Sequence, residues 1–118
     1  MGNKKMKFKI GQVVSHKLFD YKGVIFGADP RFKGTAAWYQ QVARSRPPKD
    51  KPWYRVLVHG SAQTTYVAER NLEIEESAIA IEHPLMPLLF DDLEGSAYTR
   101  TLSWDGDVPL IPSTIAIA

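Results

Sequence analysis

The sequence predicts a small, mainly β protein built on a five-stranded β-barrel, with a short helical insertion and an irregular C-terminal extension. Five short β-rich runs are separated by polar turns, and closure of such strands into a barrel removes exposed sheet edges. The chain has 118 residues, of which 44% are hydrophobic. These values are typical of one globular domain that buries its own core. No apolar run approaches the ~20 residues that a membrane-spanning helix requires.

The first two β-rich runs predict a hairpin. Residues 8–16 form the first run, in which Gly11 marks a bend. A polar turn leads into the second run, residues 24–27, which stops at Asp29-Pro30. Two β-rich runs joined by a short polar turn are typical of an antiparallel hairpin.

An insertion of a different character follows this hairpin. Thr35 can cap a short helix over residues 36–44, in which Trp38 and Val42 share the inner face because they lie four positions apart. Residues 45–52 contain three prolines, which fix φ and remove backbone donors. The sequence therefore predicts a stiff, basic surface loop after the helix.

Three further runs complete the predicted barrel. Residues 53–58 form the strongest strand, residues 64–68 return after a polar turn, and residues 72–74 form a short last strand. Beyond them, residues 83–90 are apolar but cut by two prolines, and we expect them to lie against the barrel as a strap.

We therefore expect three parts along the chain. Residues 1–7 form a basic, flexible leader, residues 8–90 form the barrel domain, and residues 91–118 form an irregular C-terminal tail.

Charge is distributed unevenly along the chain. Residues 1–60 hold thirteen Lys/Arg and three Asp/Glu, a formal charge of +10, whereas residues 61–118 hold two and ten, a formal charge of −8. Such a split is typical of a basic surface that faces a polyanion or an acidic partner. The alternative is that the two halves neutralise each other in the fold.

Composition and spacing argue against an enzyme. The chain has no cysteine, so disulfides, thiol nucleophiles and cysteine-based metal sites are excluded. The three histidines, His16, His59 and His83, have no spacing typical of a metal site. No glycine pattern typical of phosphate binding is present. We expect no catalytic site, no metal and no cofactor.

Several motifs together resemble a known family. The run at residues 8–16, the segment 21–25 and the Asp29-Pro30 pair are similar to the opening of the heat-shock protein HspQ family. That family is also called the YccV-like or hemimethylated-DNA-binding domain. The strand that begins Pro52-Trp53-Tyr54 and the segment 65–72 resemble its central strand and its closing hairpin.

This resemblance implies a fold and a role. The fold would be a small, SH3-like β-barrel, and the protein would be a cytoplasmic, non-enzymatic module without a membrane segment. It would bind double-stranded DNA methylated on one strand, in connection with heat shock. The alternative is a stress-related adaptor that binds an ATP-dependent protease and its substrates. A homo-oligomer, specifically a trimer, would fit the family.

The insertion holds residue types that DNA binding needs, namely cations for phosphates and amides for base edges. Trp38 and Tyr39 lie among them, and an aromatic surface can contact the 6-methyl group of adenine as it would the thymine methyl. The alternatives are a solvated loop and a tryptophan that belongs to the core. The predicted DNA-binding residues are Arg31, Lys33, Gln40, Gln41, Arg44, Arg46, Lys49 and Lys51.

The strap supplies the candidate residues for binding a protein. They are Leu85, Leu88, Leu89 and Phe90. The alternative is that these side chains cap the open end of the barrel, which we favour. Salt dependence separates the two functions, because DNA binding weakens steeply with salt and apolar docking does not.

Overall fold

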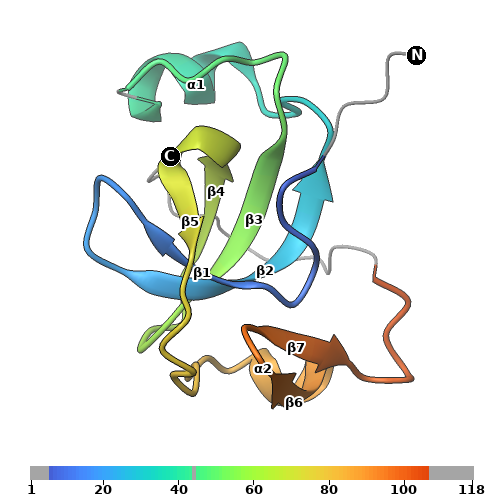
Figure 1. Ribbon diagram of the computed structural model, residues 1–118. Helices are drawn as coiled ribbons and strands as arrows, with labels where there is room; N and C mark the ends of the chain where they lie inside the picture. Colours follow the sequence, from blue (N-terminus) through green and yellow to red (C-terminus); the bar gives the residue numbers. More distant parts are fainter. Residues whose placement is uncertain (1–5, 44, 107–118) are drawn as a thin grey trace.

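The protein forms a five-stranded antiparallel sheet with one small layer above it and one below (Figure 1). The computed structural model describes residues 6–43 and 45–106. Its elements, in chain order, are β1 (Val13–His16), β2 (Lys22–Asp29), α1 (Ala36–Val42), β3 (Trp53–Val58), β4 (Thr64–Ala68), the 3-10 turn η1 (Glu69–Asn71), β5 (Leu72–Ile74), α2 (Met86–Leu89), β6 (Phe90–Glu94) and β7 (Ala97–Arg100).

The strands of the main sheet follow the order β4-β3-β2-β1-β5. The two edge strands, β4 and β5, are joined by the three-residue turn η1, so the sheet edges meet at one end. The five predicted β-rich runs are thereby confirmed as strands. The first run is shorter than expected because Gly11, at φ +96°, turns the chain before β1 begins. No helix in the described residues is long and apolar enough to cross a membrane.

A second, two-stranded sheet lies below the main sheet. β6 and β7 pair as an antiparallel hairpin, and α2 leads directly into β6 (Figure 1). The hairpin is attached to the main sheet through a bridge between Gln12 and Ala97 and a hydrogen bond that Tyr98 N donates to Gly11 O at 2.7 Å. Residues 90–100 therefore differ from the irregular tail that the sequence predicts from residue 91 onward.

The main sheet is buried on both faces. Neighbouring residues on a strand point to opposite faces, and Val13 and Val14 accordingly belong to different hydrophobic clusters. The same holds for Val56 and Leu57. A strand buried on both faces is apolar at successive positions, and this explains why these runs were recognisable in the sequence.

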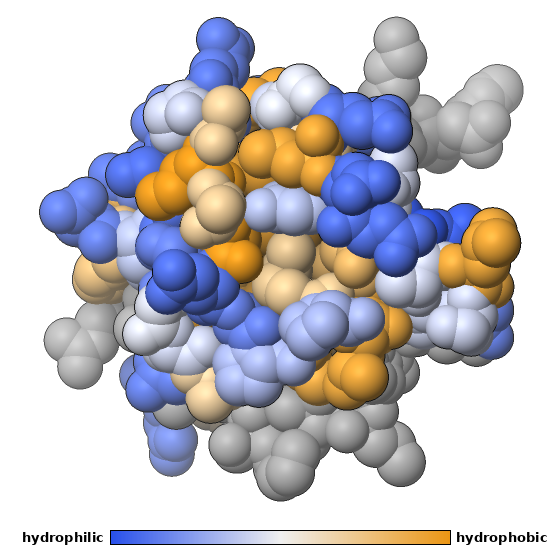
Figure 2. Space-filling model, turned by 90° about the horizontal axis from the view of Figure 1, so that it is seen from below, coloured by the Kyte–Doolittle hydropathy of each residue, from blue (hydrophilic) through white to orange (hydrophobic). Residues whose placement is uncertain are grey.

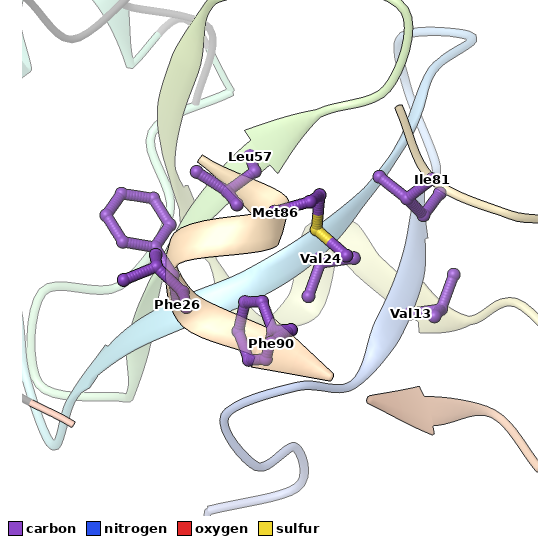
Figure 3. Packing of buried hydrophobic residues seen from close by; sticks show 8 residues of the cluster. Val13, Val24, Phe26, Leu57, Ile81, Met86 and Phe90 are labelled. Carbon is purple, nitrogen blue, oxygen red and sulfur yellow. The ribbon is translucent and has the colours of Figure 1, made fainter. Parts of the chain in front are cut away.

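One hydrophobic cluster, here called the lower cluster, joins the main sheet to the hairpin layer. Met86 and Phe90 pack against Val24 and Leu57 of the sheet (Figure 3). Leu89 belongs to the same cluster. Leu89 and Phe90 are 5% and 4% exposed, so they belong to the core. The strap thus covers one face of the sheet.

A histidine fastens the strap to the sheet. His83 Nδ1 accepts a hydrogen bond from Leu85 N, and His83 Nε2 lies 3.0 Å from Gln63 O. With Nδ1 as an acceptor, Nε2 carries the proton and donates it to that carbonyl. Burial lowers the pKa of His83, which favours the neutral ring that this pairing requires.

Replacing Phe90 tests whether the hairpin layer is part of one cooperative core. Phe90→Ala should lower the free energy of unfolding by about 3–5 kcal/mol, because the ring is buried against the sheet. Leu88→Ala is the matched control: Leu88 is 63% exposed in the preceding helix α2, and its loss should cost less than ~0.5 kcal/mol. Urea unfolding measures both, and similar values for the two variants would contradict this packing.

Candidate nucleic-acid interface

An aromatic cluster attaches the insertion to β3 and β4 at the upper end of the sheet. Trp53 of β3 and Tyr66 of β4 are buried, and Phe32, Trp38 and Tyr39 of the insertion pack onto them. The ring centroids of Phe32 and Trp53 are 4.9 Å apart in an edge-to-face arrangement. Aromatic pairs of this geometry contribute about 0.5–1.5 kcal/mol each beyond burial. The cluster therefore fixes the insertion on the sheet.

The helix of the insertion is confirmed, but its inner face differs from the prediction. Thr35 caps α1, as expected, and accepts a hydrogen bond from Trp38 N at 3.1 Å. The buried side chain of α1 is Tyr39, whereas Trp38 and Val42 are only partly buried. Tyr39 lies four positions before the buried Ala43, and the Tyr39 hydroxyl donates a hydrogen bond to a backbone carbonyl group of the loop. These partners set the rotation of the helix.

The proline loop is held by the polar ends of two aromatic residues. The Tyr39 hydroxyl donates to Pro47 O at 2.7 Å, and the Trp53 indole N–H donates to Pro48 O at 3.0 Å. Arg46 adopts φ +51°, an uncommon conformation for a residue other than glycine. A residue keeps such a strained conformation only where the surrounding contacts hold its backbone in place. The loop is therefore stiff, as the prolines predict.

Arg31 and Lys33 lie on either side of a partly buried ring, that of Phe32. Phe32 packs into the aromatic cluster, and its two chain neighbours are exposed. The Phe32 ring leaves no room for a side chain at Gly34, where an added Cβ would lie 2.6 Å from the ring. Phe32 N also donates to Lys49 O at 2.9 Å. The two cations are therefore held in place on a fixed backbone.

A buried hydroxyl holds the start of the insertion. The Tyr66 hydroxyl donates to Asp29 Oδ2 at 2.6 Å and accepts from Lys33 N at 3.0 Å. Burial and the hydrogen bond to the Asp29 carboxylate raise the pKa of Tyr66 well above its usual value. The hydroxyl therefore stays protonated and keeps this pairing throughout the neutral range.

Two cations lie over the aromatic rings. Lys49 Nζ is 4.3 Å from the centroid of Tyr39, and the Arg55 guanidinium is 4.5 Å from the centroid of Tyr66. Arg55 also forms an ion pair with Asp29 at 3.6 Å. Lys49 thus has a structural partner that the sequence did not reveal, while Lys51 is simply exposed.

The polar side of α1 lies beside the loop. Gln40 and Gln41 are exposed, as predicted, and Arg46 Nη1 donates to Gln40 Oε1 at 3.2 Å. Arg44 lies outside the described residues. The described part of the insertion thus gathers seven of the eight predicted DNA-binding residues around the aromatic cluster.

Sequence reasoning missed Arg70, which supports the loop from the neighbouring turn. Arg70 Nη2 donates to Ser45 O at 2.6 Å, and Asn71 Nδ2 donates to Ser45 Oγ at 3.2 Å. The basic leader reaches the same turn, because Lys7 N donates to Glu69 Oε2 at 2.9 Å. Arg70 lies between the two runs predicted as strands at residues 64–68 and 72–74, and this position was the signal available in the sequence.

The four predicted protein-binding residues lie in the opposite layer. Leu89 and Phe90 are buried in the lower core, Leu85 is partly buried against it, and Leu88 is exposed. Figure 2 shows this lower side, where hydrophobic and hydrophilic residues alternate over the surface. Leu88 alone of the four therefore offers a largely free apolar side chain.

The basic insertion and the acidic β6–β7 hairpin occupy different ends of the molecule. α1 and its loop lie above the sheet, and the acidic hairpin lies below it (Figure 1). Asp91, Asp92 and Glu94 of the hairpin are exposed. The Arg55–Asp29 ion pair joins residues within the basic half. The upper end can therefore face a polyanion while the acidic hairpin faces away from it.

The three histidines have structural roles, because each accepts a hydrogen bond from a backbone N–H group. His16 Nδ1 accepts from Leu18 N and Phe19 N, and His59 Nδ1 accepts from Glu82 N. In residues 6–43 and 45–106, no group of three His, Cys, Asp or Glu side chains could hold a metal ion.

A comparison with protein families identifies the chain. The family model described as "Hemimethylated DNA-binding protein YccV like" matches residues 6–97. This range begins just before the first strand and extends to the first residue of β7. The match confirms the family that the sequence motifs indicate.

A matched pair of lysines tests the contact between cation and ring. Lys49→Met should lower the free energy of unfolding by about 0.5–1 kcal/mol, because it removes the ammonium over Tyr39. Lys51→Met, two residues further along the same loop, should change it little. Thermal and urea unfolding measure both, and equal effects would mean that the ring contact contributes nothing to stability.

Proposed function

Because the chain belongs to the YccV-like family of hemimethylated-DNA-binding proteins, we propose that its basic insertion binds double-stranded DNA that is methylated on one strand. The family is a DNA-binding one. The observation that carries the assignment to this surface is the set of exposed cations held on the aromatic cluster.

The geometry of the insertion suits a phosphate backbone. Arg31 and Lys33 extend from a backbone fixed by Phe32, and Lys51 extends from the loop beside it. Cations that are already in place lose less conformational entropy when they meet phosphates. The exposed amides of Gln40 and Gln41 are of the type that pairs with the edge of adenine in the major groove.

The charge at the opposite end of the molecule also favours DNA bound at the insertion. The acidic side chains of the β6–β7 hairpin repel phosphates, so this end favours a complex in which DNA lies against α1 and its loop. In this orientation the exposed Leu88 stays clear of the DNA.

The adaptor role remains the second candidate. It is favoured by Leu88, which is 63% exposed on a short helix at the end away from the basic insertion. It is disfavoured by Leu89 and Phe90, because both are used in the core of the same chain. A role in heat shock, a homo-oligomer such as a trimer and a cytoplasmic location stay predictions.

The test is a fluorescence-anisotropy titration with unmethylated, hemimethylated and fully methylated duplexes of one sequence, over a range of salt concentrations. We expect the hemimethylated duplex to bind most tightly. The double variant Arg31→Glu/Lys33→Glu should bind more weakly. The negative slope of log K against log salt should become shallower by about 2, close to 1 per lost phosphate contact.

The control keeps the same change of charge. Lys17→Glu/Arg100→Glu alters two exposed cations outside the insertion and should leave the salt slope nearly unchanged. Equal weakening by the two double variants would indicate a response to net charge alone. Absence of binding to all three duplexes at low salt would overturn the proposed function and leave the adaptor as the leading candidate.

A further inference from the structure

The two tryptophans of the aromatic cluster are used differently. Trp53 is fully buried, and its indole N–H donates to Pro48 O at 3.0 Å. Trp38 is partly exposed, and in the described part of the chain its indole N–H donates to no side chain or carbonyl group. The fold therefore uses both the ring and the donor of Trp53, but leaves part of the Trp38 ring and its donor at the surface.

Trp38 is nevertheless held in a fixed position. Its backbone N–H is capped by Thr35, and its ring stacks on Phe32 with centroids 6.0 Å apart and an angle of 28° between the planes. The edge of Tyr66 packs against it at a centroid distance of 5.8 Å. An apolar surface supported in this way can contact a ligand with little loss of side-chain entropy.

The surroundings of Trp38 combine the groups that a base edge and its phosphates need. Gln41 lies three positions later in α1, so it is a neighbour of Trp38 on the helix surface. Arg31 and Lys33 flank Phe32, the ring on which Trp38 stacks. The partly exposed indole thus has an exposed amide on its own helix, and two exposed cations flank the ring on which it stacks.

We propose that Trp38 reads the methyl group on one strand of hemimethylated DNA and that Gln41 reads the adenine edge on the unmethylated strand. This inference rests on the proposed function. A methyl group on a base edge in the major groove is recognised by apolar contact, as the thymine methyl is. The amide of Gln41 pairs with an adenine whose major-groove N6–H is free, and this is the adenine of the unmethylated strand, because N6-methylation replaces that hydrogen. Trp38 therefore meets N6-methyladenine on one strand, and Gln41 meets the unmethylated adenine on the other.

The size of the effect follows from the burial of one methyl group. Such burial contributes about a fourfold preference for the methylated base. Trp38→Ala should reduce the ratio of affinities for hemimethylated and unmethylated duplexes to near one. The ratio is the readout because the Trp38 ring also packs on Phe32, so its loss can lower the affinity for every duplex. Leu88→Ala removes an exposed apolar side chain at the other end and should leave the ratio unchanged.

Anisotropy titrations of the wild type and both variants give these ratios, with a third duplex that carries C5-methylcytosine on one strand. The inference predicts that the preference is specific for N6-methyladenine. A ratio that persists in Trp38→Ala, an equal loss of affinity for all duplexes, or an equal preference for C5-methylcytosine would overturn it. These results leave the proposed function standing, whereas failure of the wild type to bind any duplex overturns both.

A measurement on the wild type covers the case in which Trp38→Ala does not fold. The protein is labelled with 5-fluorotryptophan, and the Trp38 fluorine resonance is assigned with Trp38→Phe, which keeps a ring on Phe32. The resonance should shift differently with N6-methyladenine and unmethylated duplexes. Identical shifts in the two complexes would overturn the inference.

Discussion

The packing of Phe32 onto Trp53 is the contact on which the proposed binding surface depends. It fixes a segment that would otherwise be a basic surface loop, with the ring centroids 4.9 Å apart. Tyr39 and Trp53 then tie the two adjacent prolines down through their polar atoms. The same rings that form the upper core thus set the positions of the exposed cations, so stability and the proposed binding share one set of contacts.

The basic insertion and the acidic β6–β7 hairpin lie at opposite ends of the molecule (Figure 1). Local sequence holds most cations before residue 61 and most carboxylates after it. The two halves also meet, because hydrogen bonding to Ser77 and, to a smaller degree, the charge of Lys22 in the first half lower the pKa of Glu75 in the second. Neutralisation of one half by the other, the alternative left open by composition, takes place locally between groups such as Lys22 and Glu75. The cations of the insertion stay apart from the carboxylates of the hairpin, and such a basic end is of the kind that attracts polyanions.

The predictable parts of the fold are those that local patterns specify. β1 to β5 were recognisable because their runs are β-rich and are bounded by turns. The β6–β7 hairpin was missed because an irregularity between Phe90 and Leu93 breaks the alternation of buried and exposed residues. The rotation of α1 was also beyond the sequence: Tyr39 with Ala43 and Trp38 with Val42 have the same spacing, and the partners on the sheet decide between them. Of the site, the exposed cations and amides were predictable, whereas the ring contacts of Lys49 and Arg55 depend on tertiary structure.

The location of the binding surface can be tested most directly by following backbone amide resonances of the ¹⁵N-labelled protein during titration with a hemimethylated duplex. The account predicts that the shifted amides belong to residues 31–42 and 46–51, and that those of the β6–β7 hairpin stay in place. Shifts centred on α2 and the hairpin, with the insertion unchanged, would contradict it.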